Sequence, residues 1–255
     1  MLIIPVLVYS QKLDMDLIKG IKPRSIGPAG MAGRVTAIDV VNSRPEVIYA
    51  GTASGGLWKS ESGGIAWEPI FDKQTTASIG AVAIQQSNPS VIWVGTGEGN
   101  PRNSLNGGDG IYKSLDGGKN WIKMGLEKTR HIHRIIIDPM NPNTVYVAAI
   151  GSPWGIHSER GVYKTTDGGK SWNKILYVND KTGAADLVMD PSNPNKLVVA
   201  MWEHYRQPWF FTSGGKGSGL YVTHDGGENW VKRTDEDGLP KGDLGRIGLA
   251  IAPSN

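Results

Sequence analysis

The hydrophobic positions of this chain fall into short runs that recur in the same order four times. Each repeat opens on an apolar run and passes through a turn into a second apolar run. A third run leads through a glycine-rich turn into a fourth, more polar run. Short runs of this kind bounded by Gly, Pro, Asn and Asp predict β-strands, so the pattern predicts four antiparallel strands in each repeat of roughly fifty residues.

The repeats can be placed from these runs. The first runs are residues 34–40, 79–85, 132–138 and 184–190, and the second runs are 47–53, 91–97, 144–150 and 196–202. The third runs read GLWKS, GIYKS, GVYKT and GLYVT. Four-stranded units that cannot bury their own faces must stack on neighbours, which predicts an all-β fold, a β-propeller.

The predicted ring is incomplete. Four complete blades cover about residues 34–70, 79–124, 132–175 and 184–233, and a fifth begins at residue 244. We therefore expect the partial propeller to occupy residues 34–255 after a lead-in at 11–33. We also expect further C-terminal blades or domains of the same protein, because four blades and a fragment cannot close a ring.

A glycine-rich turn joins the third and fourth strands of every repeat. The copies read SLDGGKNW, TTDGGKSW and THDGGENW, with a variant, SESGGIAW, in the first repeat. The aspartate can accept backbone N–H bonds within its own turn, the glycines suit positive φ, and the tryptophan is large enough to fill the gap between blades. We predict a structural role for Asp116, Trp121, Asp167, Trp172, Asp225 and Trp230.

Composition limits the function. The net charge of +3 is too small for a nucleic-acid polyelectrolyte, and the absence of cysteine says that any export does not depend on disulfides. Residues 1–10, MLIIPVLVYS, are apolar but too short to span a bilayer. They match the end of a signal peptide without its basic start, with a buried strand as the alternative. We expect a secreted, periplasmic or cell-surface protein without a membrane span.

The glycine-rich turns resemble the Asp-box of BNR-repeat propellers. Together with the DPxNP turns and VIYAGT, they make residues 26–255 similar to the N-terminal part of sortilin-like secreted propellers and to xyloglucanase-type glycoside hydrolases. The resemblance is specific for the fold and weak for the activity, because Asp-boxes occur in enzymes and binding proteins alike.

Blade topology places the Asp-boxes on one face and the connections between second and third strands on the other. These connections are long in blades two to four, at residues 98–109, 151–160 and 203–218. Rings stack on tryptophan and guanidinium groups bind carboxylates, so this rim suits a peptide or glycan ligand. The candidate binding residues are Arg102, Asn103, Trp154, Arg160, Arg206 and Trp209.

A glycoside hydrolase is the alternative function. Its two carboxylates would come from Glu98, Asp109 and Glu203, the weak catalytic candidates. The resemblance to xyloglucanases places a catalytic aspartate at the position of Ala53, which cannot transfer a proton. A sialidase would carry Arg-Ile-Pro and an arginine triad; the former is absent, and Arg34, Arg134 and Arg246 are scattered. A third possible class is a complex-assembly propeller of the kind that helps to build photosystem II, which has the same type of blade.

No motif indicates a metal or cofactor. GTGEGN resembles a phosphate loop, but Pro101 follows it where a helix should start. His131 and His133 lie on one side of a strand without a third ligand. We expect no metal and no cofactor, and a binding or scaffold protein rather than an enzyme.

Overall fold

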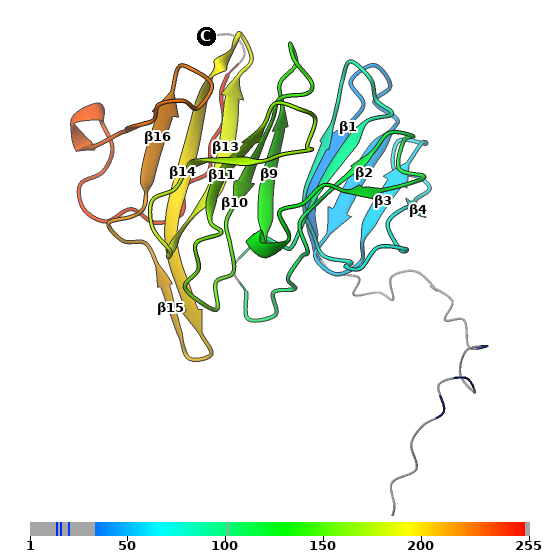
Figure 1. The fold of residues 1–255 in the computed structure, drawn as a ribbon, viewed down its shortest axis with the longest axis horizontal. Helices are drawn as coiled ribbons and strands as arrows, with labels where there is room; N and C mark the ends of the chain where they lie inside the picture. The colour runs from blue at the N-terminus through cyan, green and yellow to red at the C-terminus, as the bar shows by residue number, and fades with distance from the viewer. Residues whose placement is uncertain (1–13, 15, 17–19, 21–33, 101, 253–255) are drawn as a thin grey trace, which may run out of the picture.

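The computed structural model describes residues 14, 16, 20, 34–100 and 102–252, and these form four antiparallel sheets. Figure 1 shows the sheets side by side, in chain order from blue to orange. In each sheet the strands follow the order of the sequence, as in an up-and-down propeller blade. The predicted all-β fold with four-stranded blades is confirmed.

The sheets are named blades 1 to 4. Blade 1 contains β1 (Val35–Val40), β2 (Ile48–Thr52), β3 (Leu57–Ser60) and β4 (Glu68–Pro69). Blade 2 contains β5 (Ile79–Ile84), β6 (Ile92–Thr96), β7 (Ile111–Ser114) and β8 (Ile122–Lys123). Blade 3 contains β9 (Ile132–Ile137), β10 (Val145–Ala149), β11 (Gly161–Thr165) and β12 (Asn173–Leu176). Blade 4 contains β13 (Thr182–Asp190), β14 (Asn193–Gln207), β16 (Gly219–Thr223) and β17 (Val231–Lys232), and β15 (Phe210–Ser213) pairs with the end of β14. Two short 3₁₀ turns, η2 (Glu127–Thr129) and η3 (Asp235–Asp237), lie between blades 2 and 3 and after blade 4.

Residues 244–252 follow blade 4 without forming a strand in the described part of the chain. Leu244 makes an isolated bridge with Gly215, and the Leu249 N–H donates to Asp186 Oδ2 at 3.0 Å. The segment expected to start a fifth inner strand therefore lies against blade 4, but no second strand pairs with it. The predicted signal-peptide remnant at 1–10 and nearly all of the lead-in at 11–33 lie outside the described residues.

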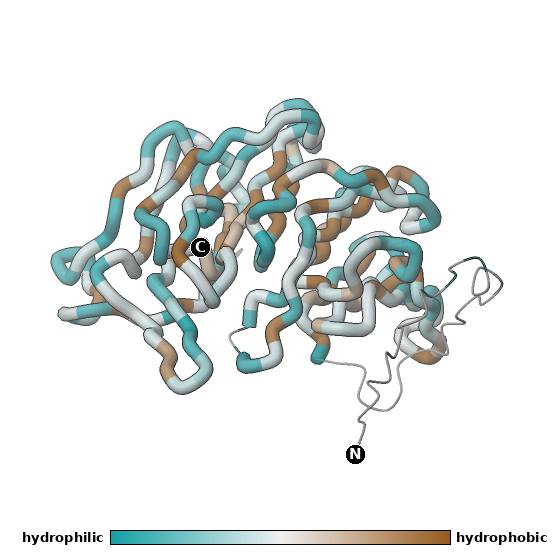
Figure 2. The backbone as a smooth tube through the Cα atoms, turned by 60° about the horizontal axis from the view of Figure 1, so that its bottom comes forward, coloured by the Kyte–Doolittle hydropathy of each residue, from teal (hydrophilic) through white to brown (hydrophobic). Residues whose placement is uncertain are grey.

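The second strand of each blade carries a large share of the buried core, and its small residues set the distance between blades. Gly51 in β2 faces Ile79 of blade 2 so closely that a Cβ on this glycine would come 2.5 Å from the isoleucine Cγ2. Blade 3 has Ala148 at the matching position, where the neighbour in blade 4 is the smaller Ala184. Figure 2 shows the hydrophobic stretches along the strands and the hydrophilic ones in the connections.

Each Asp-box is held by hydrogen bonds within its own turn. Asp116 Oδ1 accepts from the Ser114 hydroxyl and from the Asn120 N–H, both at 2.9 Å. The bonds from Asn120 lower the pKa of Asp116 to about 2. In blade 1 Ser62 stands in the aspartate position, and its Oγ accepts from the Ala66 N–H at 2.9 Å. The variant box therefore keeps the backbone bond that defines the turn.

The Asp-box tryptophans join neighbouring blades. Trp121 donates its Nε1–H to the carbonyl of Ile70 in blade 1 at 2.8 Å, and Trp172 donates to Met124 in blade 2 at 2.7 Å. Trp230 packs into the core shared by blades 3 and 4. Trp67 is 37% exposed and bonds only within its own turn, to Gly64.

The Asp-boxes and the long connections lie on opposite faces. In blade 2 the Gly117 N–H of the Asp-box donates to Ser90, in the turn between the first and second strands. The connection between the second and third strands instead contacts the segment that leads from one blade to the next, as when Gly108 N–H donates to Arg130 O at 2.7 Å. We call the side with the long connections the loop-rich face.

Candidate functional site

The long connections of blades 2, 3 and 4 meet at Arg206. Its backbone N–H donates to the Pro153 carbonyl of blade 3 at 2.8 Å, and its guanidinium donates to the Asn103 side-chain carbonyl of blade 2. The guanidinium also lies 4.4 Å from the ring centroid of Phe211. One residue therefore fixes three loops relative to one another.

Arg206 lies in a hairpin that the sequence did not reveal. Residues 203–218 were expected to be an irregular loop, but β14 continues to Gln207 and pairs with β15, with Gln207 opposite Phe210. The aromatic residues on either side of Pro208, Tyr205 before it and Phe210 and Phe211 after it, are a weak strand signal that could have indicated the hairpin. Figure 1 shows it extending beyond the blades at the end opposite the Asp-boxes.

Large aromatic side chains are exposed on these loops. Trp209 is 81% exposed and Phe210 is 57% exposed at the tip of the β14–β15 hairpin, and Trp154 is 41% exposed in the blade 3 loop. Exposed aromatics held on ordered hairpins and loops are typical of ligand-binding surfaces. The side chain of Arg102, in the long connection of blade 2, is exposed as well.

Glu98, the first of the candidate acids, is buried in an ion pair. Arg34 donates from Nε to Glu98 Oε1 at 2.8 Å, and its terminal nitrogen bonds the other carboxylate oxygen. The Glu98 N–H donates to Ser78 Oγ at 3.0 Å, and the Glu98 carbonyl accepts from His131 Nδ1 at 2.7 Å. This carboxylate is therefore held by a two-pronged pair and is not presented to solvent.

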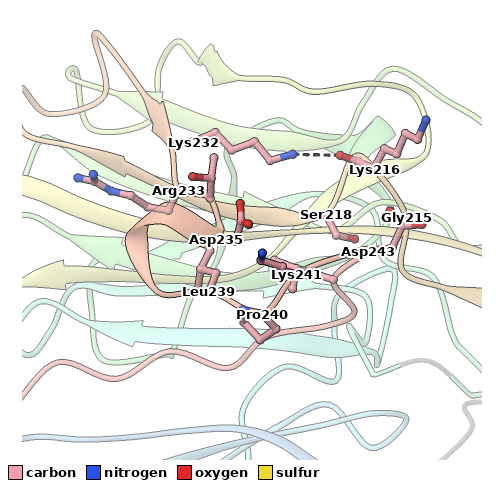
Figure 3. A pocket seen from close by; sticks show the side chains of 13 residues that line it. Gly215, Lys216, Ser218, Lys232, Arg233, Asp235, Leu239, Pro240, Lys241 and Asp243 are labelled. Atoms are coloured by element: carbon pink, nitrogen blue, oxygen red, sulfur yellow. Dashed lines mark hydrogen bonds between the residues drawn. The ribbon is translucent and has the colours of Figure 1, made fainter.

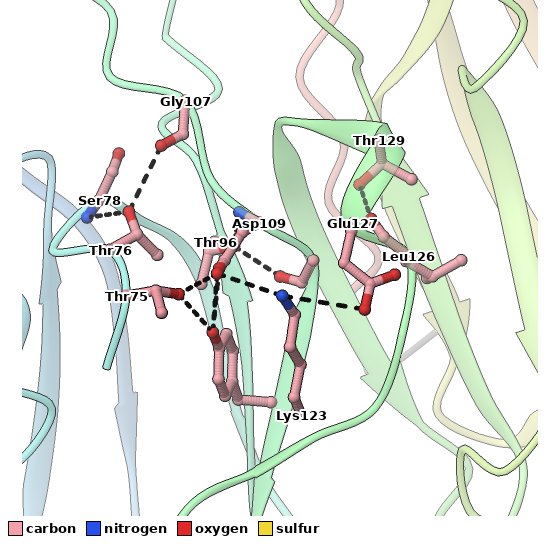
Figure 4. A network of polar contacts seen from close by, with 12 residues as sticks. Thr75, Thr76, Ser78, Thr96, Gly107, Asp109, Lys123, Leu126, Glu127 and Thr129 are labelled. Atoms are coloured by element: carbon pink, nitrogen blue, oxygen red, sulfur yellow. Dashed lines mark hydrogen bonds and ion pairs between the residues drawn. The ribbon is translucent and has the colours of Figure 1, made fainter. Parts of the chain in front are cut away.

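Asp109 is fixed in a network of polar contacts (Figure 4). Its carboxylate accepts from the Thr75 hydroxyl, from the Tyr112 hydroxyl at 2.9 Å and from Lys123 Nζ at 3.3 Å. Although partial burial acts in the opposite direction, these partners together lower the pKa of Asp109. A carboxyl group held ionised in this way is a poor general acid.

Glu203 lines an open cavity. Its Oε2 accepts from the Gly217 N–H at 2.9 Å, and its own N–H donates to Ser218 Oγ at 2.9 Å. A cavity of about 220 Å³ is lined by Ile156, Lys181, Glu203, His204, Tyr205 and Thr212. The three candidate acids are thus held by three separate sets of partners.

Arg160, expected on the rim, is fully buried. It donates to the carbonyls of Lys181 at 2.7 Å and Ser152 at 2.6 Å and lies 3.1 Å from His204 Nδ1. Burial lowers the pKa of Arg160 to about 10. Arg160 therefore holds the blade 3 loop against blade 4 and does not reach the surface.

The other arginines near the starts of inner strands have separate partners. Arg134 Nε donates to Asp186 Oδ1 at 2.7 Å. Arg246 Nη2 lies 2.8 Å from His133 Nε2, and its Nη1 donates to the Asn100 side-chain carbonyl at 3.3 Å. The Arg246 guanidinium carbon lies 5.6 Å from the ring centroid of Trp202. In the sequence these arginines are only scattered. Their partners come from other blades, which no local pattern reveals.

Three buried histidines lie beside these arginines. Burial lowers the pKa of His131 to about 4 and that of both His133 and His204 to about 3, and nearby guanidinium groups act in the same direction. The His204 ring stacks on Trp202 with a centroid distance of 4.3 Å. All three are therefore neutral at pH 7, and each has a structural partner.

The described residues show neither a metal cluster nor a membrane segment. In residues 34–100 and 102–252 no three or more His, Asp or Glu side chains come together in a way that could hold a metal ion. Within the same described part, no helix has the length and hydrophobicity needed to cross a bilayer.

The blades, the Asp-box turns and the loop-rich face define an Asp-box β-propeller. A family model described as "Sortilin, neurotensin receptor 3" matches residues 109–238, about half of the chain. The chain belongs to the sortilin (Vps10) family. No curated protein gives a significant match.

Solved structures support the propeller fold. A GH74 enzyme from Niastella koreensis is 24% identical with a TM-score of 0.59, over 77% of this chain and 29% of that one. An ancestral GH74 enzyme is 23% identical with a TM-score of 0.61, over 79% and 26%. The GH74 xyloglucanase from Xanthomonas campestris is 18% identical with a TM-score of 0.56, over 76% and 29%. The chain spans less than a third of these proteins, and the likeness concerns the fold.

Proposed function

We propose that this chain is part of an exported binding or scaffold propeller that takes a peptide or glycan ligand on its loop-rich face. The observation that carries the proposal is the exposed aromatic hairpin tip, with Trp209 81% exposed on a loop system fixed by Arg206. An aromatic surface that is rigidly held loses little conformational entropy when a ligand binds. The family description, which names a receptor, agrees with binding as the function.

The acids of the same face support binding over hydrolysis. Glycosidic bond cleavage needs one carboxyl group that is protonated and a second that is free to act as base or nucleophile. Glu98 is paired with Arg34, and Asp109 is bound by Tyr112 and Lys123. Ala53, at the position where xyloglucanases carry an aspartate, is buried in blade 1.

The test compares ligand capture with turnover on the same protein. The chain is screened against arrayed peptides and glycans, and bound ligands are measured by calorimetry with wild type and Trp209→Ala. We expect Trp209→Ala to weaken binding by about tenfold or more, as is common for an aromatic hot spot. Trp67→Ala, which removes an exposed tryptophan from the Asp-box face, is the matched control and should leave affinity unchanged.

Two results would overturn the proposal. One is turnover of a β-glucan or a sialoside that Glu98→Gln abolishes, because this would make the protein a glycosidase. The other is binding that Trp67→Ala weakens and Trp209→Ala does not, because this would place the ligand on the opposite face.

A further inference from the structure

The third strand of blades 3 and 4 carries the same polar arrangement around a tyrosine. In blade 3, Lys174 Nζ lies 5.5 Å from the Tyr163 ring centroid and donates to the Ser158 carbonyl. In blade 4, Lys232 Nζ lies 5.8 Å from the Tyr221 ring centroid and donates to the Lys216 carbonyl at 3.0 Å. In both blades the carbonyl belongs to the fifth residue before the tyrosine.

The two arrangements differ in one group, a carboxylate. In blade 3 the residue after Ser158 is Glu159, whose Oε2 accepts from the Tyr163 hydroxyl at 3.0 Å. In blade 4 the residue after Lys216 is Gly217, which has no side chain. Blade 2 also has an acid in this place, since Asp109 accepts from both Tyr112 and Lys123. Blade 4 therefore keeps the basic and aromatic groups of the arrangement without its acid.

A pocket lies beside Lys232 in blade 4, and Figure 3 shows the ends of the Lys232 and Lys241 side chains near its centre, whereas those of Lys216 and Arg233 point away to either side. Its volume is about 260 Å³, and its wall is formed by the loop before β16, the end of β17 and the segment that follows. The charged side chains that line it are Lys216, Lys232, Arg233, Lys241, Asp235 and Asp243.

The charges of this pocket favour an anion. Among the described residues no ion pair involves Lys216, Lys232 or Lys241, whereas Arg233 pairs with Asp237 at 3.1 Å. With Arg233 paired to Asp237, the three lysines stand against Asp235 and Asp243, which leaves an excess of one positive charge in the lining. Lys232, which in blade 4 occupies the place of Lys123 and Lys174, has only a neutral carbonyl as its partner.

We propose that this pocket binds a carboxylate-bearing side chain of an acidic peptide segment, which supplies the acid that blade 4 lacks. The carboxylate accepts hydrogen bonds from Lys232 and Lys241. Such charge-assisted bonds are stronger than bonds between neutral groups. The site is independent of the aromatic hairpin, because its lining residues do not include Trp209 or Arg206.

The test uses a short fluorescent glutamate-rich peptide, and a glutamine-rich peptide of the same length as the reference. Fluorescence anisotropy with the whole chain should show binding of the glutamate peptide only, and binding that weakens as salt is added. Lys232→Met should weaken it by about tenfold or more, the loss expected for one charge-assisted hydrogen bond. Lys174→Met removes the matching lysine of blade 3, where Glu159 already supplies the acid, and should have no effect.

The remaining outcomes separate this site from the proposed function. Trp209→Ala should leave glutamate-peptide binding unchanged, so failure of the ligand screen and failure of this site are distinguishable. Equal binding of the two peptides, absence of binding by the folded chain, or equal losses in Lys232→Met and Lys174→Met would each overturn the inference. Circular dichroism of both variants shows that they are folded.

Discussion

Lys164 Nζ donates to the carbonyl oxygen of Gly226 at 2.8 Å, and this bond joins the third strand of blade 3 to the Asp-box of blade 4. The Tyr146 hydroxyl donates to the same oxygen at 3.1 Å, and Lys164 lies over the Tyr146 ring at 5.6 Å. Lys113 makes the equivalent bond from blade 2 to the Gly168 carbonyl at 3.2 Å. A lysine and an aromatic residue of one blade therefore hold the Asp-box of the next.

Replacing Lys164 by Met should weaken the contact between blades 3 and 4. The variant loses one hydrogen bond from a charged donor and leaves the Gly226 carbonyl with only Tyr146, so we expect a loss of about 1.5–3 kcal/mol in the free energy of unfolding. Urea denaturation followed by tryptophan fluorescence measures it. The control is Lys170→Met, which removes an exposed lysine from the Asp-box of blade 3. A loss as large in the control would mean that the loss of a lysine, and not the bond to Gly226, accounts for the effect.

The Asp-box tryptophans should differ in their contribution to stability according to whether a preceding blade covers them. Trp121→Phe removes the bond to Ile70 and should cost about 1 kcal/mol, and Trp121→Ala should cost about 3–5 kcal/mol. Trp67→Ala should cost far less, because Trp67 is 37% exposed and bonds only within its turn. Thermal unfolding of the three variants provides the comparison, and equal losses at Trp67 and Trp121 would contradict the inter-blade role.

The Arg34–Glu98 pair should stabilise the loop-rich face. Arg34→Met leaves the buried Glu98 carboxylate without its cation, which we expect to cost about 3–5 kcal/mol. Glu98→Ala should cost less, because the guanidinium of Arg34 is about a third exposed and solvent can reach it. A double-mutant cycle in urea isolates the pairwise energy. A coupling energy near zero would show that the pair forms without contributing to stability.

Acid should destabilise the protein from about pH 6.5 downward. The pKa of His131 is lowered to about 4 and that of His133 and His204 to about 3, whereas an unfolded histidine titrates near 6.5. Between these values the unfolded chain binds protons that the folded chain does not, so stability falls as pH decreases and the loss is complete below the folded pKa values. The unfolding free energy measured between pH 8 and 4 tests this.

A histidine variant shows which groups cause the slope. His204→Gln should reduce the pH dependence between about pH 6.5 and 4, because one of the histidines whose pKa the fold lowers is gone. The exposed His224 provides the control, and His224→Gln should leave the slope unchanged. An unaltered slope in His204→Gln would assign the acid sensitivity to other groups.

The sequence alone determined the blades of this protein. Alternation of short apolar runs with Gly, Asn and Pro turns is a local property, and the regular return of the Asp-box indicated the order of the four main strands in each blade, though not the additional strand β15. The parity of an up-and-down sheet then placed the long loops on the face opposite the Asp-boxes. Each of these inferences needs only neighbouring residues or the repeat itself.

The tertiary structure decided which side chains meet. Glu98 lies in a loop that reads as exposed, yet Arg34 of another blade reaches it and burial follows. Arg160, also in a loop, is enclosed by carbonyls of blades 3 and 4. These partners are far apart in the chain, so their distance depends on how the blades stack. Stacking is set by packing across blade faces, which leaves no periodic signal in the residues of the loops.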